Sequence, residues 1–351
     1  MMVGIGNLVQ FERYRPDRKM TFFPNTYEGW ENEAKKRLEP GPFHYIADGA
    51  GSGATMTATR EAFHRLQLIP RMLNNVEERY LELSLFGQPF SAPLFLAPVG
   101  VQSIAHPEGE LATARAAKKV GLPYIASTAS SYSLEAIASE LGDHPHWFQL
   151  YWGKDPEVTA SFLNRAEKEN YSAIVVTLDT IMLSWREKDL EKGYLPFLEA
   201  KGIANYLSDP VFRSRLKAPP EEDIQSAVAQ FIATFSNASL TWEDLSFLRA
   251  HTSLPVILKG VLHPEDARKA LDAGVDGLIV SNHGGRQVDG AIASLKALDA
   301  ILEVVKDEIP VLLDSGIRRG ADVIKALALG ASAVLVGRPY IYGLAVGGEE
   351  G

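Results

Sequence analysis

The sequence contains no cysteine among its 351 residues, so disulfides, thiolate metal sites and a cysteine nucleophile are excluded. It also lacks an excess of basic side chains: 44 acidic residues against 35 lysines and arginines give a net charge of −9. That balance argues against a protein that binds nucleic acid through its phosphates. No apolar run approaches the roughly 18 residues that a membrane-spanning helix needs. We therefore expect a cytoplasmic protein with no membrane or nucleic-acid partner.

Short apolar, β-branched segments recur along the chain and are typical of strands buried on both faces. They begin near residues 94, 123, 147, 173, 255, 277, 310 and 333. Helix-like stretches separate most of them, and several of these stretches end in glycine, as helices commonly do. Eight such βα units predict an α/β fold, a (β/α)8 TIM barrel, with a doubly wound open sheet as the structural alternative.

Two segments lie outside this repeat, although we expect residues 1–351 to form a single barrel domain. Residues 1–90 are predicted to be an N-terminal helical extension, in which Asn25-Thr26-Tyr27-Glu28 resembles a capping box. Residues 180–240 form a long insertion after the fourth strand. We interpret it as a lid over the active face, with a disordered linker as the alternative. Its expected aromatic anchors are Trp185, Tyr194, Phe197, Tyr206, Phe212 and Phe231.

Polar residues of catalytic types stand at the carboxyl ends of the predicted strands, where barrels place their active sites. Gln149 and Tyr151 end the third strand, and Thr177 and Asp179 end the fourth. The members of each pair are two residues apart, so they share one face of their strand. The other polar strand ends are Ser127, Lys259, Ser281 and His283.

The most informative segment is Ser-Asn-His-Gly-Gly-Arg-Gln-Val-Asp-Gly at residues 281–290, directly after a buried strand. His283 can take a proton, and Arg286, three residues later, can hold a carboxylate. Together they suit abstraction of a proton from a hydroxy acid.

The last two predicted strands end in turns that combine glycine and arginine. These turns are Asp314-Ser315-Gly316-Ile317-Arg318-Arg319-Gly320 and Gly337-Arg338. Such turns, with a helix beginning at about Arg319, suit a phosphate group. With the strand-end amides, hydroxyls and Lys259, they suggest a phosphorylated cofactor across the barrel mouth. This description fits FMN better than pyridoxal phosphate, although a lysine aldimine at Lys259 stays open from spacing alone.

These motifs resemble those of the FMN-dependent L-2-hydroxy acid oxidases and dehydrogenases, which include glycolate oxidase, lactate oxidase and lactate 2-monooxygenase. The resemblance runs from about Tyr27 to Leu344, and the family signature Ser-Asn-His-Gly-x-Arg-Gln is complete at 281–287. The other matching motifs are Ala97-Pro98, His106-Pro107-Glu108-Gly109, Phe148-Gln149-Leu150-Tyr151, Leu258-Lys259-Gly260 and residues 314–320.

The resemblance implies a role for each strand-end residue and predicts no metal site. His283 would be the base, Asp179 would pair with it, and Tyr151 would bond the substrate oxygen. The expected carboxylate ligands are Tyr45, Arg186 and Arg286. The expected FMN contacts are Ser127, Gln149, Thr177, Lys259, Ser281, Asp314, Arg318 and Arg338.

The lid sequence looks most like that of lactate 2-monooxygenase, so lactate and O2 are the expected substrates. The product would then be the 2-oxo acid or its decarboxylated derivative. Because relatives are usually tetramers or larger, a homo-oligomer is also expected. The alternatives are a dehydrogenase that passes electrons to a quinone or cytochrome, and a degenerate FMN-binding protein without catalysis.

Two departures from the family pattern lead to further expectations. Val99 stands where many relatives carry a hydroxyl, so that contact to FMN is lost. Only thirteen residues follow Arg338, whereas the family continues for several tens. We therefore expect the last barrel helix to be missing. The strand side chains expected to lie bare on their outer side are Leu94, Leu96, Val334 and Val336.

Overall fold

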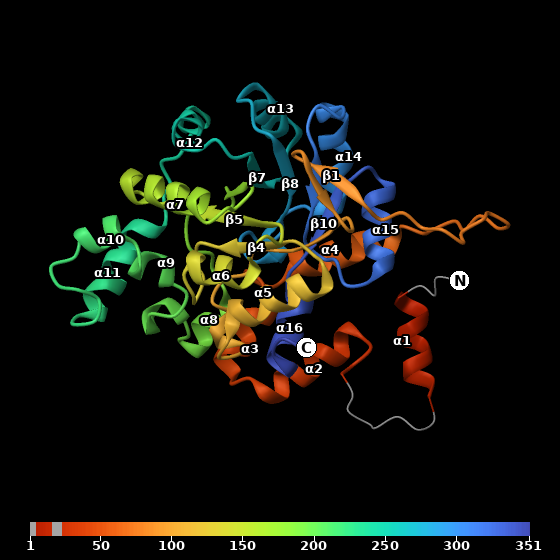
Figure 1. The fold of residues 1–351 in the computed structure, drawn as a ribbon, viewed down its shortest axis with the longest axis horizontal. Helices are drawn as coiled ribbons and strands as arrows, with labels where there is room; N and C mark the ends of the chain where they lie inside the picture. The colour runs from red at the N-terminus through yellow and green to blue at the C-terminus, as the bar shows by residue number, and fades with distance from the viewer. Residues whose placement is uncertain (1–4, 16–22) are drawn as a thin grey trace.

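A closed barrel of eight parallel strands forms the centre of the protein (Figure 1). The computed structural model describes residues 5–15 and 23–351. The barrel strands are β3 (Leu94–Leu96), β4 (Tyr124–Ser127), β5 (His146–Tyr151), β6 (Ile174–Thr177), β7 (Val256–Val261), β8 (Gly277–Val280), β9 (Val311–Leu313) and β10 (Ala333–Val336). Each begins within one residue of its predicted start. The strand order is β10-β3-β4-β5-β6-β7-β8-β9, which confirms the predicted TIM barrel and rules out the open sheet.

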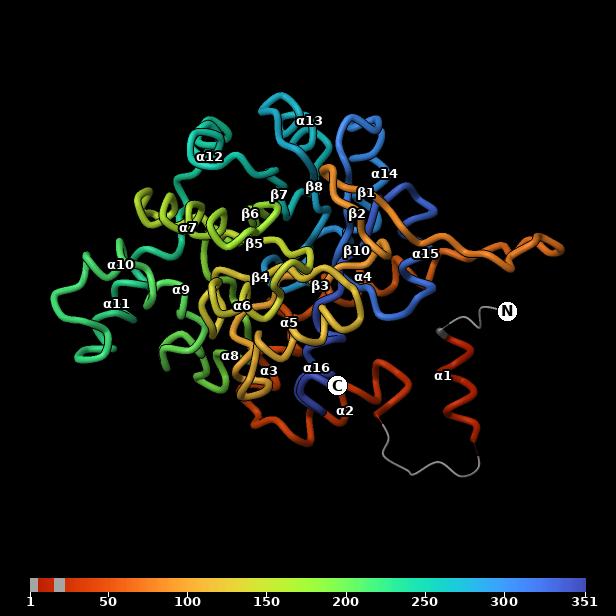
Figure 2. Tube along the Cα trace, viewed as in Figure 1, coloured from red at the N-terminus to blue at the C-terminus, as the bar shows by residue number. Residues whose placement is uncertain are grey.

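Helices surround the barrel because each βα unit must bury the outer face of its strands (Figure 2). They are α5 (Gly109–Val120), α6 (Leu134–Leu141), α7 (Pro156–Lys168), α12 (Leu245–His251), α13 (Pro264–Asp272), α14 (Ser294–Val305) and α15 (Gly320–Ala328). Their ends follow local sequence signals. The Asp155 carboxylate accepts bonds from the first amides of α7, and Gly121 ends α5 at a φ of +74°.

A short hairpin closes the amino end of the barrel. It consists of β1 (Leu83–Leu85) and β2 (Gln88–Phe90), which pair antiparallel. Phe90 packs against Phe95 and Trp147 inside the barrel, with ring centroids 4.9 and 5.9 Å apart. Because these side chains fill the interior at that end, the carboxyl ends of the strands form the mouth that remains available to a ligand.

The described part of the N-terminal extension is helical up to Arg65, as predicted, whereas its last residues form the β1–β2 hairpin. The helices of the extension are α1 (Ile5–Tyr14), α2 (Tyr27–Arg37), α3 (Pro40–Ala47) and α4 (Ala54–Arg65). Tyr45 on α3 reaches the mouth of the barrel. The Thr26 hydroxyl accepts a bond from the Gly29 amide and caps α2. Between α4 and β1 the chain extends away from the barrel in Figures 1 and 2.

The lid segment (residues 180–240) folds into short helices, so the disordered-linker alternative does not fit the structure. They are α8 (Glu187–Lys192), α9 (Ala204–Leu207), α10 (Pro210–Ser214), α11 (Ile224–Phe235) and the 3-10 turn η2 (Pro196–Glu199). Tyr206, Phe212 and Phe231 are buried anchors. The prediction that Trp185 anchors the lid is wrong, because its side chain is 71% exposed.

The expectation that β3 and β10 have a bare outer surface is wrong for half of the side chains named. Val334 is 0% exposed and Leu96 is 8% exposed, whereas Leu94 and Val336 are partly exposed. The chain also forms a helix after β10, α16 (Arg338–Gly347), which packs against α2. Among the described residues, no helix combines the length and apolar character needed to cross a membrane.

Candidate active site

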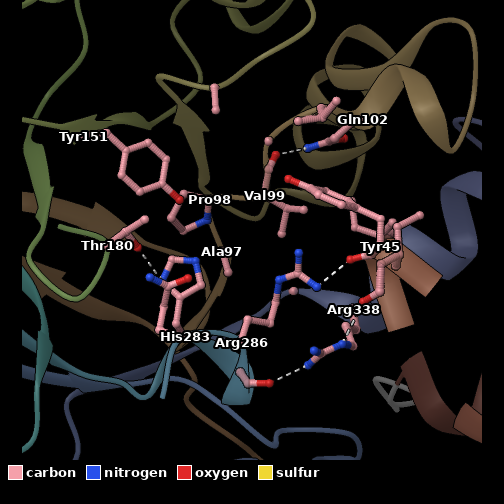
Figure 3. A pocket seen from close by; sticks show the side chains of 18 of the residues that line it. Tyr45, Ala97, Pro98, Val99, Gln102, Tyr151, Thr180, His283, Arg286 and Arg338 are labelled. Atoms are coloured by element: carbon pink, nitrogen blue, oxygen red, sulfur yellow. Dashed lines mark hydrogen bonds between the residues drawn. The ribbon is translucent and has the colours of Figure 1, made fainter. Parts of the chain in front are cut away.

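A cavity of about 240 Å³ opens at the carboxyl ends of the barrel strands. Its wall draws Tyr45 from α3, Tyr151 from the end of β5, Arg186 from the lid segment, and His283 and Arg286 from the turn after β8. Figure 3 shows Tyr151, His283, Arg286 and Tyr45 around one shared space. Five of the six predicted catalytic and carboxylate-binding residues therefore line this cavity, although they come from four separate parts of the sequence.

His283 and Asp179 form a close pair beside it. His283 Nδ1 lies 2.7 Å from Asp179 Oδ1, and both side chains are largely buried. The Thr180 hydroxyl donates to the same carboxylate oxygen at 3.0 Å. With the imidazole proton on Nδ1 and donated to Asp179, Nε2 keeps a free lone pair. His283 lines the cavity, so this lone pair suits a base.

Electrostatics keep the two groups in complementary states. Burial lowers the pKa of His283, against the opposing effect of Asp179, so the imidazole favours its neutral form. Burial alone would raise the pKa of Asp179, but His283 and Lys259 outweigh it and hold that pKa below its ordinary value. A neutral base hydrogen-bonded to an ionised carboxylate is the arrangement that general base catalysis uses.

A pH prediction follows from the lowered pKa of His283. The base is lost only when the pH falls through that pKa, which lies below 6.5. The acid limb of substrate-driven flavin reduction should therefore have its midpoint below pH 6.5. Anaerobic stopped-flow measurements of kcat/KM across pH 4.5–8 test this, with FMN retention checked at each pH. A midpoint above 6.5 would contradict the assignment.

Arg286 and Arg186 place two cations at one corner of the cavity, where Arg186 also lies 3.7 Å from the Asp189 carboxylate. Arg286 donates to the backbone carbonyls of Tyr45 and Asp48, the latter at 3.0 Å, and lies over the Tyr45 ring. Arg186 donates to the carbonyl of Arg286 at 3.3 Å and to the Gln287 side chain at 3.2 Å. Burial first, and Arg186 second, lower the pKa of Arg286 to about 9. A bound carboxylate would offset this cost of a buried charge.

Two separate sets of polar contacts link the predicted ring-binding residues. Ser127 donates to Gln149 Oε1 at 2.8 Å, and Gln149 Nε2 donates to the Thr177 hydroxyl at 2.8 Å. The second set centres on Lys259, whose Nζ lies 3.0 Å from Ser281 Oγ and 3.3 Å from Asp314 Oδ2. Burial alone would lower the pKa of Lys259, but Asp314 and Asp179 raise it. Lys259 is thus a fixed cation at the barrel mouth.

The structure does not bring every predicted cofactor residue to the cavity surface. Lys259, Asp314, Arg318 and Arg338 line the cavity. Ser127, Gln149 and Ser281 are buried and do not line the cavity. Ser281 accepts from Lys259, and the Ser127 hydroxyl accepts from the amide of Ala129 at 3.1 Å; Lys259 and Ala129 both line the cavity. Thr177 lines a separate hollow beside Trp152 and Trp242.

In the predicted phosphate turn after β9, the arginine side chain and the backbone amides differ in whether they already have an acidic partner. The Arg318 guanidinium lies over the Tyr27 ring at 4.3 Å and, within residues 5–15 and 23–351, forms no ion pair with a carboxylate. Burial lowers its pKa, so an anion would stabilise it. The predicted phosphate site at the α15 N-terminus stays a prediction, and two of its amides are already occupied. The Asp322 carboxylate already accepts from the amides of Arg318 and Arg319, at 2.9 and 3.1 Å.

Three supporting residues were not singled out in the sequence. Thr180 holds the Asp179 carboxylate, as described above. Gln287 Nε2 donates to the carbonyl of Asp179 at 2.9 Å, and Gln287 Oε1 accepts from Arg186 at 3.2 Å, which ties the turn after β8 to the lid segment. The Tyr340 hydroxyl donates to the carbonyl of Ala97 at 2.8 Å. Gln287 belongs to the signature, so its position carried a signal, whereas Thr180 and Tyr340 carried none.

Comparison with known proteins identifies the family. The model for "FMN-dependent dehydrogenase" matches residues 34–351. The chain belongs to the FMN-dependent dehydrogenase family. It is 46% identical over 329 residues to an L-lactate oxidase of Lysinibacillus sphaericus, covering 94% of this chain and 84% of the relative. It is 43% identical to a 4-hydroxymandelate oxidase of Amycolatopsis orientalis, with coverages of 92% and 87%. A crystal structure of mandelate oxidase superposes with a TM-score of 0.82 at 41% identity, covering 93% of this chain and 89% of that one.

Membership makes FMN the cofactor of this oxidoreductase, and the residues of the cavity fit it. The partly buried Arg318, whose guanidinium pairs with no carboxylate among the described residues, suits the phosphate, and Lys259 suits negative charge on a reduced ring. Val99, which lines the cavity, offers no side-chain hydroxyl to FMN, as its sequence implied. When bound, FMN accepts the two electrons that oxidation removes from a substrate.

Gly260 is required because of its neighbour Asp179. Its φ is +105°, and a Cβ here would lie 2.9 Å from Asp179 Cβ and 3.0 Å from Oδ2. Gly260→Ala should push the carboxylate away from His283 and slow flavin reduction by about 10²-fold, since a misplacement of ~1 Å can cost that much. Gly274→Ala is the control, because it shares a positive φ of +68° but meets nothing within 4 Å. Equal reduction rates in the two variants, with equal FMN content, would contradict this role.

Proposed function

We propose that this family member oxidises L-2-hydroxy acids, L-lactate among them, to 2-oxo acids and passes the electrons to O2. The observation that carries the proposal is the His283–Asp179 pair, at 2.7 Å, beside the corner of Arg286 and Arg186. A 2-hydroxy acid offers a carboxylate for the arginines and a proton for the base. The L-lactate oxidase of Lysinibacillus sphaericus supports this substrate class.

In the proposed mechanism, each residue has a separate task. Arg286, Arg186 and Tyr45 orient the carboxylate, and His283 Nε2 takes a proton from the substrate. Tyr151 donates to the substrate oxygen. Burial raises the pKa of Tyr151, so its hydroxyl stays protonated as a donor. Asp179 holds the imidazole and stabilises it once it is protonated. Ser127, Gln149, Thr177, Lys259, Ser281, Asp314, Arg318 and Arg338 position FMN.

Anaerobic mixing tests the central step. The purified holoenzyme should lose its yellow absorbance when L-lactate is added without air. A flavin that stays oxidised with every 2-hydroxy acid would favour the degenerate FMN-binding alternative.

Product analysis in air then separates the finer alternatives. Pyruvate with peroxide indicates an oxidase, and acetate with carbon dioxide indicates the lactate 2-monooxygenase type. A reduced flavin that persists in air but reacts with a quinone or cytochrome indicates a dehydrogenase.

We also propose that the chain forms a homo-oligomer, a tetramer or larger. The segment between α4 and β1 supports this proposal, because it extends from the barrel and exposes Ile69, Met72, Leu73 and Tyr80. Apolar surface of this kind commonly marks a protein interface. Light scattering of the holoenzyme gives the mass, and a monomer would contradict the proposal.

A further inference from the structure

One part of the cavity wall is not assigned to the carboxylate, the hydroxyl or the proton of the substrate, and it is the part that the substrate's side chain would contact. This inference rests on the proposed function. Carbon 2 of a 2-hydroxy acid carries a hydrogen, a hydroxyl, a carboxylate and a side chain. Arg286 and Arg186 account for the carboxylate, while Tyr151 and His283 account for the hydroxyl and the proton. The side chain must therefore point towards the part of the wall that these four residues leave free.

The part of that remaining wall that the lid segment contributes is mainly apolar, with Thr180 and Ser236 as its uncharged polar members. Arg186 is the one charged lid residue among the described residues that line the cavity. The apolar lid residues that line it are Leu183, Leu195, Phe197, Phe231, Ile232 and Phe235. A charged side chain would lose water against these six residues without gaining an opposite charge.

Three phenylalanines form the centre of this wall. The ring centroids are 5.3 Å apart for Phe197 and Phe231, 5.8 Å for Phe197 and Phe235, and 4.8 Å for Phe231 and Phe235. Phe231 and Phe235 stand four residues apart on α11 and so share one face of that helix. Phe235 also lies 5.1 Å from the Tyr151 ring, so the aromatic wall begins beside the residue expected to hold the substrate hydroxyl.

The apolar wall continues from this cluster to the mouth of the cavity. Ile232 is 50% exposed and Leu183 is 63% exposed, yet both line the cavity. A methyl group would reach only the inner end of this surface, whereas a longer side chain would cover the phenylalanines and extend to the mouth. Each further buried methylene favours binding roughly fourfold, and an aromatic ring adds ring–ring contacts.

We propose that this enzyme prefers L-2-hydroxy acids with a bulky apolar side chain, best an aromatic ring, over L-lactate. Phe235 and Ile232 select the side chain: Phe235 packs against its inner part, and Ile232 packs against its outer part.

Two measurements on the FMN-loaded enzyme test the preference. The ratio of kcat/KM for L-3-phenyllactate to that for L-lactate should be at least about 10. The unreactive 2-oxo acids give an independent reading: phenylpyruvate should bind at least about tenfold more tightly than pyruvate, as followed by the change in flavin absorbance. Equal or opposite preferences in both measurements would overturn the proposal.

Variants locate the preference in the lid. Phe235→Ala should lower the phenyllactate-to-lactate ratio about tenfold, and Ile232→Ala should lower it roughly fourfold, the effect of about one lost methylene contact. Ile232 is half-exposed, so its variant tests the idea even if Phe235→Ala misfolds. Ile324→Ala is the matched control, because Ile324 lies on α15, is 54% exposed and does not line the cavity. An unchanged ratio in both lid variants would overturn the assignment.

The design separates this inference from the proposed function. Reduction by lactate with no preference for phenyllactate would leave the function standing and reject the aromatic wall. If no 2-hydroxy acid reduces the flavin, the proposed function fails. The binding ratio of phenylpyruvate to pyruvate still decides whether the wall selects aromatic side chains.

Discussion

His283→Ala should slow reduction of bound flavin by substrate by about 10²–10⁴-fold or more, the usual contribution of a general base. The Nδ1 atom of His283 lies 2.7 Å from Asp179 Oδ1. His283 is also the one histidine among the described residues that lines the cavity, so the alanine variant leaves no imidazole there. The remaining neighbours of the substrate are Tyr151 and the arginines, whose proton affinities make them donors rather than bases at neutral pH.

Anaerobic stopped-flow reduction measures this effect separately from reoxidation. FMN content should stay near that of the parent, because Arg318 and Lys259, the proposed phosphate and ring ligands, are unchanged in this variant. His251→Ala is the matched control, since His251 is exposed on α12 and does not line the cavity. A His283→Ala enzyme that is reduced at nearly the parental rate would remove His283 from the mechanism.

The barrel could be predicted from the sequence because its strands carry a strong signal. Residues such as Ile174, Val175 and Val176 are buried on both faces, so each strand is a continuous apolar run. The meeting of His283, Asp179 and Arg286 followed from the same rule, because the carboxyl ends of parallel strands converge at one mouth.

Other features depended on contacts that no local pattern reports. Asp322 caps the turn before α15 through the amides of Arg318 and Arg319, and only the three-dimensional structure shows that these amides are occupied. Ser127 and Gln149 end their strands as predicted, yet they bond each other and lie behind the cavity surface. The direction in which a strand-end side chain points depends on its neighbours in the barrel, and the spacing of residues in the sequence does not identify those neighbours.

In the lid segment too, some features could be predicted from the sequence and others depended on tertiary contacts. Its aromatic content predicted packing, and Phe231 is indeed buried. The sequence did not reveal that Phe235 faces Tyr151, because those residues are brought together by the path of α11. It also gave no reason to separate Trp185, which is exposed, from the buried anchors.

Arg286→Lys should weaken binding of a substrate carboxylate about 10–100-fold, although the charge is kept. Arg286 already donates through Nη1 to the carbonyls of Tyr45 and Asp48, which fixes the plane of the guanidinium. The other nitrogens then present parallel donors that match a carboxylate. A lysine ammonium is a point donor on a flexible stem, so it loses both the fixed orientation and one of the two bonds. One charge-assisted hydrogen bond is worth about 1.5–3 kcal/mol, which is the expected loss.

Titration of the holoenzyme with pyruvate, followed by flavin absorbance, gives the dissociation constant without turnover. Steady-state kinetics with L-lactate should show a matching rise in KM. Arg213→Lys is the control, because Arg213 forms an exposed pair with Glu221 and does not line the cavity. If Arg286→Lys binds pyruvate as tightly as the parent, the carboxylate is held elsewhere. Arg186, which donates to the carbonyl of Arg286 and contacts the same Tyr45 ring, would then be the remaining cation in position to hold it.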